Sequence, residues 1–125
     1  MARNSVLIVD DHAAFRSLAR EVLDRAGFEV VAEAEDGVGA LAAAARLNPS
    51  VVVLDVKLPG LSGFEVARRL AVRPHPPAVV LVSTADAADF GRRIVASGAV
   101  GFITKSRLSG DTLRAVLRGH KEELE

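Results

Sequence analysis

The sequence of 125 residues contains no cysteine, and this absence removes several kinds of chemistry. Without thiols the chain forms no disulfide bond, holds no metal through sulfur and has no cysteine nucleophile. With 16 basic and 16 acidic residues its formal net charge is zero, so bulk charge does not indicate a surface for nucleic acid or for membranes. Any chemistry must therefore come from particular side chains.

Long apolar runs are also missing. No run approaches the roughly 18 residues that a membrane-spanning helix needs. The N-terminal Met1–Asn4 leads directly into a strand-like run, without the apolar stretch of a signal peptide. We therefore expect a cytoplasmic protein with no membrane partner. The length suits one domain with a core that needs no disulfides, and we predict a single domain over residues 1–125.

Short apolar runs alternate along the chain with segments whose apolar residues repeat at helical spacing. All the runs except the second are mainly apolar, which is typical of strands buried on both faces of a parallel sheet. The expected strands are Val6–Val9, Glu29–Ala32, Val51–Leu54, Ala78–Val82 and Val100–Thr104.

A helix is expected after each of these strands, and glycine or proline ends several of the helices. Ser62 and Ser109 can cap the third and the last helix. Gly91 weakens the fourth helix. The expected helices are Phe15–Ala26, Gly37–Leu47, Gly63–Val72, Ala85–Ser97 and a segment after Ser109.

This alternation predicts the fold class. Five βα units in sequence indicate an α/β domain with a single five-stranded parallel sheet, doubly wound, with helices on both faces and right-handed crossovers. The chain shows no internal repeat, low-complexity tract or interior linker.

Acidic residues follow two of the predicted strands. Asp10 and Asp11 come after the first strand and Asp55 after the third. If these strands are neighbours, three carboxylates meet at the carboxyl edge of the sheet, where open α/β sheets bind ligands. Crowded carboxylates repel one another and raise the pKa of at least one of them, and a hard cation such as Mg²⁺ removes that conflict. The sequence therefore predicts a Mg²⁺ site.

At these positions the chain resembles the receiver domain of two-component response regulators, a flavodoxin-like (βα)5 family. The resemblance covers roughly residues 5–120. The matching features are the acidic pair Asp10-Asp11, the stretch Asp55-Val56-Lys57-Leu58-Pro59-Gly60-Leu61-Ser62-Gly63, Ser83 after the fourth strand, Lys105 after the fifth, and Phe102 three residues before that lysine.

The resemblance implies a role for each acidic residue. Asp55 would be the phosphoacceptor. Asp11 and Asp55 would bind Mg²⁺ directly, together with the backbone carbonyl of Lys57, and Asp10 would act largely through water. The lysine side chain of Lys57 could reach the mouth of the site. His12 adjoins the acidic pair but is interpreted as an exposed residue at a helix start.

The resemblance also implies roles for residues after the fourth and fifth strands. Lys105 would supply a positive charge and Ser83 a hydroxyl donor to the phosphoryl oxygens, and Ser83 and Phe102 would form a switch. Taken alone, Ser83 could simply cap the next helix, Thr84 could take either part, and Phe102 could be an ordinary core residue. Ser83 is favoured over Thr84 because it directly follows the buried run. Thr84 would narrow access to Asp55.

The implied function is a signalling switch and not an enzyme. A sensor histidine kinase would phosphorylate Asp55, and the surface formed by the fourth helix, the fifth strand and the fifth helix would change. Asp11-His12 and Lys105-Ser106 are similar to the subgroup whose output is a helix-turn-helix DNA-binding domain, so the expected output is transcription. Homodimerisation on phosphorylation is a further expectation.

Two alternatives remain open. The chain could be a stand-alone receiver or one excised from the N-terminal part of a longer regulator, with DNA contacted only through an output domain that these residues lack. It could also act by protein–protein interaction without phosphorylation. A phosphatase or dehalogenase with an aspartyl nucleophile is disfavoured, because the acids after the first strand are adjacent and no threonine follows them.

Overall fold

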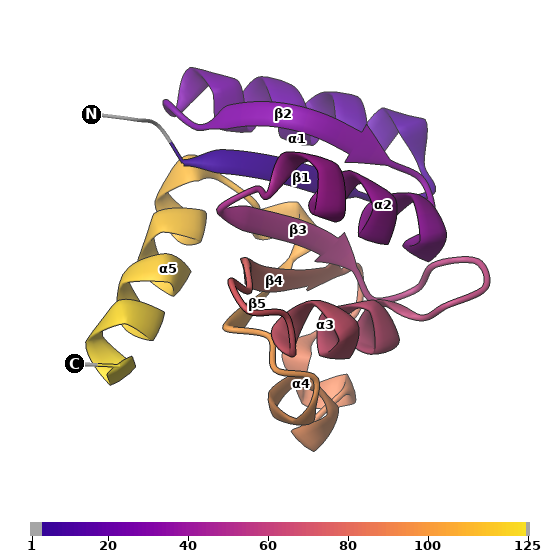
Figure 1. The fold of residues 1–125 in the computed structure, drawn as a ribbon. Coiled ribbons are helices and arrows are strands. Elements are labelled where there is room, and N and C mark those ends of the chain that lie inside the picture. The colour runs from indigo at the N-terminus through magenta and orange to yellow at the C-terminus, as the bar shows by residue number, and fades with distance from the viewer. Residues whose placement is uncertain (1–3, 125) are drawn as a thin grey trace.

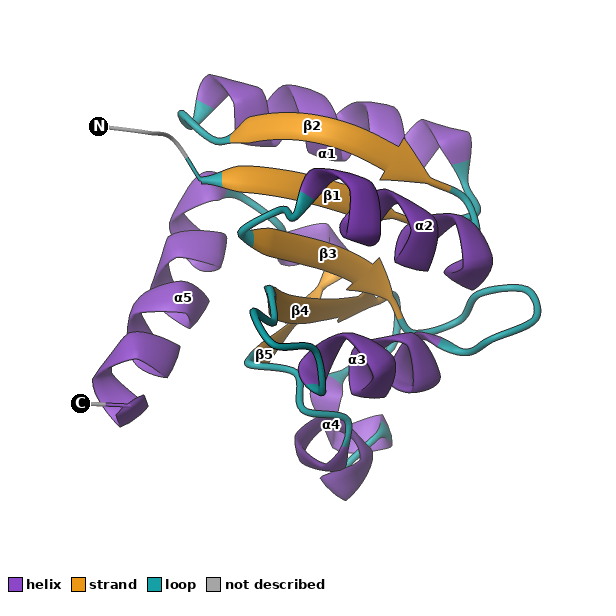
Figure 2. Ribbon diagram, in the orientation of Figure 1, coloured by secondary structure: helices purple, strands orange, loops and turns teal. Residues whose placement is uncertain are grey.

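The computed structural model describes residues 4–124, so Met1–Arg3 and Glu125, the ends of the predicted domain, lie outside the described residues. Five strands form one sheet in the order β2-β1-β3-β4-β5, and every neighbouring pair is parallel (Figure 2). The strands are β1 Ser5–Val9, β2 Glu29–Ala34, β3 Val51–Asp55, β4 Ala78–Ser83 and β5 Gly101–Thr104. The predicted α/β fold class is confirmed.

Helices cover both faces of this sheet (Figure 1). The helices are α1 Ala13–Arg25, α2 Gly37–Leu47, α3 Gly63–Ala71, α4 Arg92–Ala96 and α5 Gly110–Leu124, with 3₁₀ turns η1 Ala87–Asp89 and η2 Lys105–Arg107. The side chains of Ser62 and Ser109 accept hydrogen bonds from the backbone N–H groups of Glu65 and Thr112, as expected of helix caps. Within the described part of the chain, no helix combines the length and the apolar character needed to cross a bilayer.

Alternate residues of the strands enter two apolar layers. In β1, Val6 and Ile8 belong to the layer under α1 and α5, whereas Leu7 and Val9 belong to the layer under α2 and α3. All four side chains are fully buried. Strands that are apolar on both faces must be covered on both faces, and this explains the continuous apolar runs of the sequence.

The order of the strands brings the acidic residues together. β1 lies beside β3, and Val9 pairs with Leu54 at the carboxyl end of both strands. Asp10 and Asp55 each come one residue further along, so both reach the same edge of the sheet. The assumption that the first and third strands are neighbours is therefore confirmed.

Two local expectations were wrong. The segment Ala85–Ser97 is not one helix but the turn η1 followed by the five-residue α4. Gly91 separates them with φ of 51° and ψ of −126°, a conformation that interrupts a helix and that side chains disfavour.

The second wrong expectation is that the fifth strand is buried on both faces. The strand β5 is only partly buried, because it is an edge strand with one neighbour, β4.

Gly63, at the start of α3, lies against the backbone at the end of β3. Its N–H donates to the Val56 carbonyl at 2.8 Å, and a Cβ placed on Gly63 would overlap the Asp55 carbonyl oxygen and come within 2.8 Å of Val56 Cα. The neighbouring atoms are backbone and cannot turn aside. This close approach explains the last glycine of the stretch that follows Asp55.

We expect Gly63→Ala to lower the free energy of unfolding by about 1–3 kcal/mol, because the added methyl group overpacks against fixed backbone. Gly119 in α5 is the matched control, since nothing lies within 4 Å of the Cβ it would gain. Gly119→Ala should stabilise the protein by about 0.5–1 kcal/mol through its higher helix propensity. Urea unfolding measures both changes, and equal effects of the two substitutions would contradict the packing argument.

Candidate functional site

Four potential metal ligands meet at the carboxyl edge of the sheet. The ligand atoms of Asp10, Asp11, His12 and Asp55 all lie within 4.8 Å of one another. The two residues at the strand ends are buried, with Asp10 at 0 % and Asp55 at 3 % exposure. Asp11 and His12 lie at the solvent-facing rim. The site therefore has a buried acidic floor and an opening.

Lys105 joins the two buried carboxylates. It directly follows β5, and its side chain is only 12 % exposed. Its Nζ lies 2.6 Å from Asp10 Oδ2 and 3.3 Å from Asp55 Oδ2, and 4.6 Å from the centre of the Phe15 ring. One cation thus serves two carboxylates, and the cluster keeps an excess of negative charge. Such an excess favours the binding of a further cation.

Burial raises the pKa of the Asp55 carboxyl above its ordinary value, and the neighbouring charge of Asp10 raises it further. Lys105 and the backbone N–H of Lys57 oppose this rise in pKa, because both stabilise the carboxylate. Lys57 N–H donates to Asp55 Oδ1 at 3.2 Å. The raised pKa means that Asp55 is charged less readily here than an exposed aspartate is.

The hydrogen bonds of Asp10 leave one of its oxygens without a well-aligned donor. Asp10 Oδ1 accepts from the His12 backbone N–H at 2.8 Å and lies 3.0 Å from His12 Nδ1. Among the described residues, no hydrogen bond of acceptable geometry reaches Asp10 Oδ2, although Lys105 is close. A buried carboxylate oxygen in this state, within a set made mostly of oxygen ligands, fits a hard divalent cation.

His12 contributes more to the site than the sequence indicated. Its Nδ1 lies 3.1 Å from Asp11 Oδ1 as well as close to Asp10, and its side chain is 69 % exposed. The expectation that His12 is exposed was correct, but its contacts with both acids were missed. The spacing could have revealed one of them, because an aspartate side chain often accepts the N–H two residues further on.

Ser83 ends β4 beside Asp55. Asp55 pairs with Val82 across the two strands, so Ser83 lies one residue beyond it, and its side chain is buried. Ser83 Oγ accepts a hydrogen bond from the Ala85 N–H at 3.1 Å, which shapes the turn that follows. Thr84 and Lys57 are both exposed at this edge of the sheet.

Phe102 belongs to a line of three aromatic rings. Phe102 in β5 is partly buried, and its ring centre lies 5.8 Å from that of Phe90. Phe90 in turn lies 5.6 Å from Phe64 of α3 in an edge-to-face arrangement. Sequence reasoning missed Phe90, which carried no periodic signal because the helix around it is broken.

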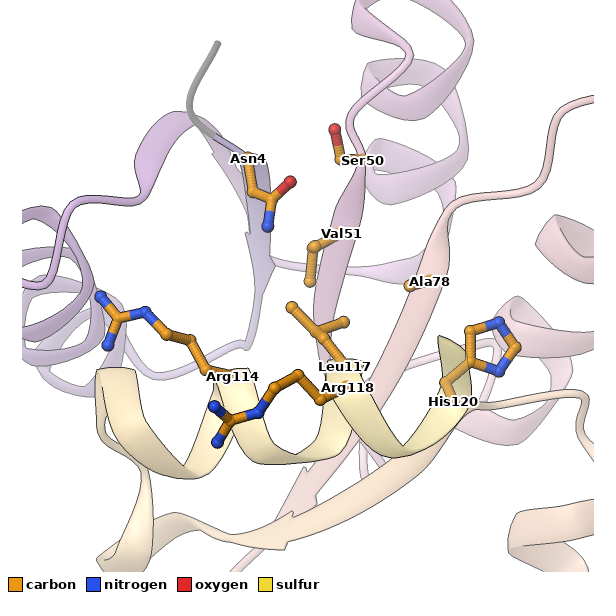
Figure 3. A pocket seen from close by; sticks show the side chains of 8 residues that line it. All are labelled: Asn4, Ser50, Val51, Ala78, Arg114, Leu117, Arg118 and His120. Carbon is orange, nitrogen blue, oxygen red and sulfur yellow. The ribbon is translucent and has the colours of Figure 1, made fainter. Parts of the chain in front are cut away.

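A pocket of about 320 Å³ lies at the opposite edge of the sheet (Figure 3). Val51 and Ala78 in its lining begin β3 and β4, the strands that Asp55 and Ser83 end. The pocket is therefore separated from the acidic cluster by the length of the sheet and is not part of the candidate site. Its other lining residues are Asn4, Ser50, Arg114, Leu117, Arg118 and His120.

The fold and the acidic cluster together define a doubly wound α/β domain with a candidate cation site at its carboxyl edge. The response regulator receiver domain matches residues 6–118, which is most of the chain. The chain therefore belongs to the response regulator receiver domain family. Receiver domains of this family are signalling switches and not enzymes of the usual kind.

Curated relatives include regulators of transcription. The response regulator GacA of Pseudomonas protegens is 39 % identical over 113 residues, covering 89 % of this chain and 53 % of GacA. BvgA of Bordetella pertussis, named as a positive transcription regulator of virulence factors, is 36 % identical over 120 residues, covering 94 % of this chain and 57 % of BvgA. The chain thus spans about half the length of these relatives.

Solved structures agree with the family. A two-component response regulator of the LuxR family from Aurantimonas sp. SI85-9A1 has a TM-score of 0.85 and 27 % identity, covering 97 % of this chain and 87 % of that one. The chemotaxis response regulator CheY4 of Vibrio cholerae has a TM-score of 0.80 and 27 % identity, covering 95 % and 99 %. The predicted family resemblance is therefore confirmed.

We expect Asp55→Asn to stabilise the protein in metal-free buffer at neutral pH. Because the pKa of Asp55 is raised, its contribution to stability is fully present below the ordinary pKa of 3.8 and is lost as the pH rises through the folded-state pKa. Asparagine does not ionise, so the substitution prevents this loss of stability at high pH. Lys105 remains paired with Asp10. The free energy of unfolding at pH 7 should therefore rise.

Thermal and urea unfolding between pH 4 and pH 8 would measure this effect. Asp24→Asn is the control, because Asp24 is an exposed aspartate of α1, and we expect a change within about 0.5 kcal/mol. If Asp55→Asn is less stable than wild type at pH 7, then the charge on Asp55 does not destabilise the folded protein.

Proposed function

We propose that Asp55 accepts a phosphoryl group from the phosphohistidine of a sensor histidine kinase, and that this modification switches the surface formed by α4, β5 and α5. The observation that carries the proposal is the arrangement around Asp55. A buried carboxylate at the end of a central strand has a raised pKa, a lysine at 3.3 Å and a second buried carboxylate beside that lysine. Family membership supports it, because receiver domains are phosphorylated by histidine kinases.

In the proposed transfer, a carboxylate oxygen of Asp55 forms a bond to phosphorus as the P–N bond of the donor breaks, and the departing imidazole takes up a proton. Lys105 already lies beside Asp55 Oδ2, so its ammonium group can contact the negatively charged phosphoryl oxygens after the transfer. Because the donor is already activated, the residues around Asp55 contribute position and charge, and Asp55 alone forms a covalent bond.

We further propose that Mg²⁺ is the cofactor. Asp11, Asp55 and the backbone carbonyl of Lys57 would hold it, and Asp10 would act largely through water. The ion would supply positive charge that offsets the negative charge of the incoming phosphoryl group. The unaligned Asp10 Oδ2 and the crowding of the carboxylates favour such an ion, as does the preference of Mg²⁺ for oxygen ligands.

Ser83 and Phe102 are the proposed switch residues. The hydroxyl group of Ser83 now accepts from Ala85 N–H in the turn after β4, so bonding to a phosphoryl group would reshape that turn. The same turn leads to Phe90, whose ring contacts Phe102. A change at Ser83 can therefore reach β5 along the chain from Ala85 to Phe90 and through the contact between the Phe90 and Phe102 rings.

We propose that the chain is one receiver domain of a longer regulator whose output is transcription. The similarity to GacA and BvgA over about half their length supports this proposal. DNA would be contacted by another part of such a protein, and phosphorylation would promote association between two receiver domains.

Asp55 is expected to be the only residue that is phosphorylated. Incubation with acetyl phosphate and Mg²⁺ should add one phosphoryl group to the wild type, visible as a single mass increment in intact-mass spectrometry and lost in alkaline hydroxylamine. Asp55→Asn should gain none. Lys105→Ala should be modified at least about 10-fold more slowly, because the developing charge loses its cation.

The control is Asp111→Asn, because Asp111 is an exposed carboxylate in the first turn of α5, far along the chain from the acidic cluster. It should be modified at the wild-type rate. Phosphoryl incorporation into Asp55→Asn would contradict the assignment. A wild type that stays unmodified, even with a purified kinase, would favour a receiver that acts by protein–protein interaction alone.

Phosphorylation should change hydrogen exchange in residues 84–105. The short α4 has no buried residue, and Gly91 already interrupts the segment before it, so rearrangement there should cost little free energy. Beryllofluoride with Mg²⁺ provides a stable substitute for the phosphoryl group. Phe90→Leu should reduce the change in β5 but keep the change at Ala85. Protection that changes only around Asp55 would contradict the proposed switch.

A further inference from the structure

A network of charged side chains joins α1 to β2 immediately behind the acidic turn. Glu33 of β2 accepts from Arg16 Nε at 3.1 Å through one oxygen and from Arg20 Nε at 2.7 Å through the other. The arginines lie four residues apart on α1, so they point to the same side of the helix. The side chains of Arg16 and Glu33 are 17 % and 28 % exposed.

The two arginines differ in their second partner. Arg16 Nη1 donates to the backbone carbonyl of Asp10 at 2.7 Å, whereas Arg20 Nη1 donates to the Val30 carbonyl in β2 at 3.3 Å. Only Arg16 therefore reaches the acidic turn. Because a guanidinium group is planar and has several fixed donors, Arg16 can bond Glu33 and the Asp10 carbonyl at the same time.

Asp10 is consequently held from three sides. Its N–H donates to the Ala34 carbonyl of β2 at 3.0 Å, its carbonyl accepts from Arg16, and its side chain accepts from the His12 N–H. These bonds fix the peptide between Asp10 and Asp11, and thus the direction in which the two carboxylates leave the chain. Sequence reasoning gave Arg16 no role.

We propose that Arg16 is a positioning residue for the acidic turn, held by Glu33, and that it preorganises Asp10 and Asp11 to bind a divalent cation. This inference rests on the proposed function, because it concerns the same cation site. Glu33 has a second task in this arrangement: its negative charge offsets that of Arg16, so the guanidinium repels an incoming cation less. Residues that orient metal ligands in this way typically change metal affinity about 10–100-fold when they are removed.

The sign of the effect separates positioning from simple charge. If Arg16 acted only through its charge, removing it would take a positive charge away from the cluster and strengthen Mg²⁺ binding. If Arg16 positions the turn, removing it lets the Asp10–Asp11 peptide move and weakens Mg²⁺ binding. A purely structural role in joining α1 to β2 would lower stability without changing the Mg²⁺ affinity of the folded protein.

The experiment is a Mg²⁺ titration followed by NMR on wild type, Arg16→Met, Arg16→Lys and Arg20→Met. Methionine keeps an apolar side chain of similar reach, and lysine keeps the charge but loses the fork of donors. Arg20→Met is the matched control, since it breaks the other half of the same Glu33 interaction on the same helix. Arg16→Met should raise the Mg²⁺ dissociation constant about 10-fold. Arg16→Lys should raise it several-fold, and Arg20→Met should leave it within about twofold of wild type.

A second measurement does not need the metal ion. Hydrogen exchange of the His12 amide in metal-free protein should become faster in Arg16→Met and stay unchanged in Arg20→Met, because only Arg16 fixes the turn. If Arg16→Met does not fold, Arg16→Lys carries the same test. If the wild type binds Mg²⁺ and Arg16→Met binds it equally well or more tightly, the role proposed for Arg16 is wrong. The proposed cation site is not contradicted by that result. A wild type that binds no Mg²⁺ at millimolar concentration would overturn the proposed cation site and this inference together.

Discussion

The structure depends on electrostatic repulsion between carboxylates that lie together at the carboxyl edge of the sheet. Asp10 and Asp55 end adjacent strands inside the fold, with Asp11 beside them and Lys105 as the single cation that contacts both buried carboxylates among the described residues. Burial removes Asp55 from water and raises its pKa, and repulsion from Asp10 raises that pKa further. The carboxylates stay close despite this repulsion, because the strands that precede them pack between two apolar layers. Such strain at a site is typical of function, since only a ligand with the right charge relieves it.

The side chains around these carboxylates come from both halves of the chain. Lys105 arrives from the edge strand β5 and bridges to Asp10 on the far side of β3 and β4. Arg16 and Glu33 hold the acidic turn from α1 and β2. Lys105 thus contacts the carboxylates with its charge, whereas Arg16 bonds to Glu33 and to the backbone of the turn. The proposed phosphoryl transfer and the proposed positioning role therefore involve different cations of the same site.

Within the region proposed to respond, the segment from η1 to α4 buries no side chain completely. The five residues of α4 include no buried side chain, whereas α3 buries Phe64, Val66, Ala67 and Leu70. Contact between the segment from η1 to α4 and the core runs through partly buried side chains such as Phe90 and Ile94. Local rearrangement costs less free energy where few apolar side chains are fully buried. The rings of Phe64, Phe90 and Phe102 connect this segment to α3 on one side and to β5 on the other.

The sequence by itself determined the α/β class, the parallel sheet and the candidate residues at strand ends, because continuous apolar runs and glycine or serine at helix ends are local signals. The tertiary structure alone decided which of these residues meet. The pairing of Lys105 with Asp10 as well as Asp55 and the bond from Arg16 to the Asp10 carbonyl both depend on side-chain reach, which spacing does not encode. The break at Gly91 and the exposure of β5 escaped prediction for a related reason. Helical periodicity does not reveal a residue in an unusual conformation, and an apolar run does not reveal whether its strand has one neighbour or two.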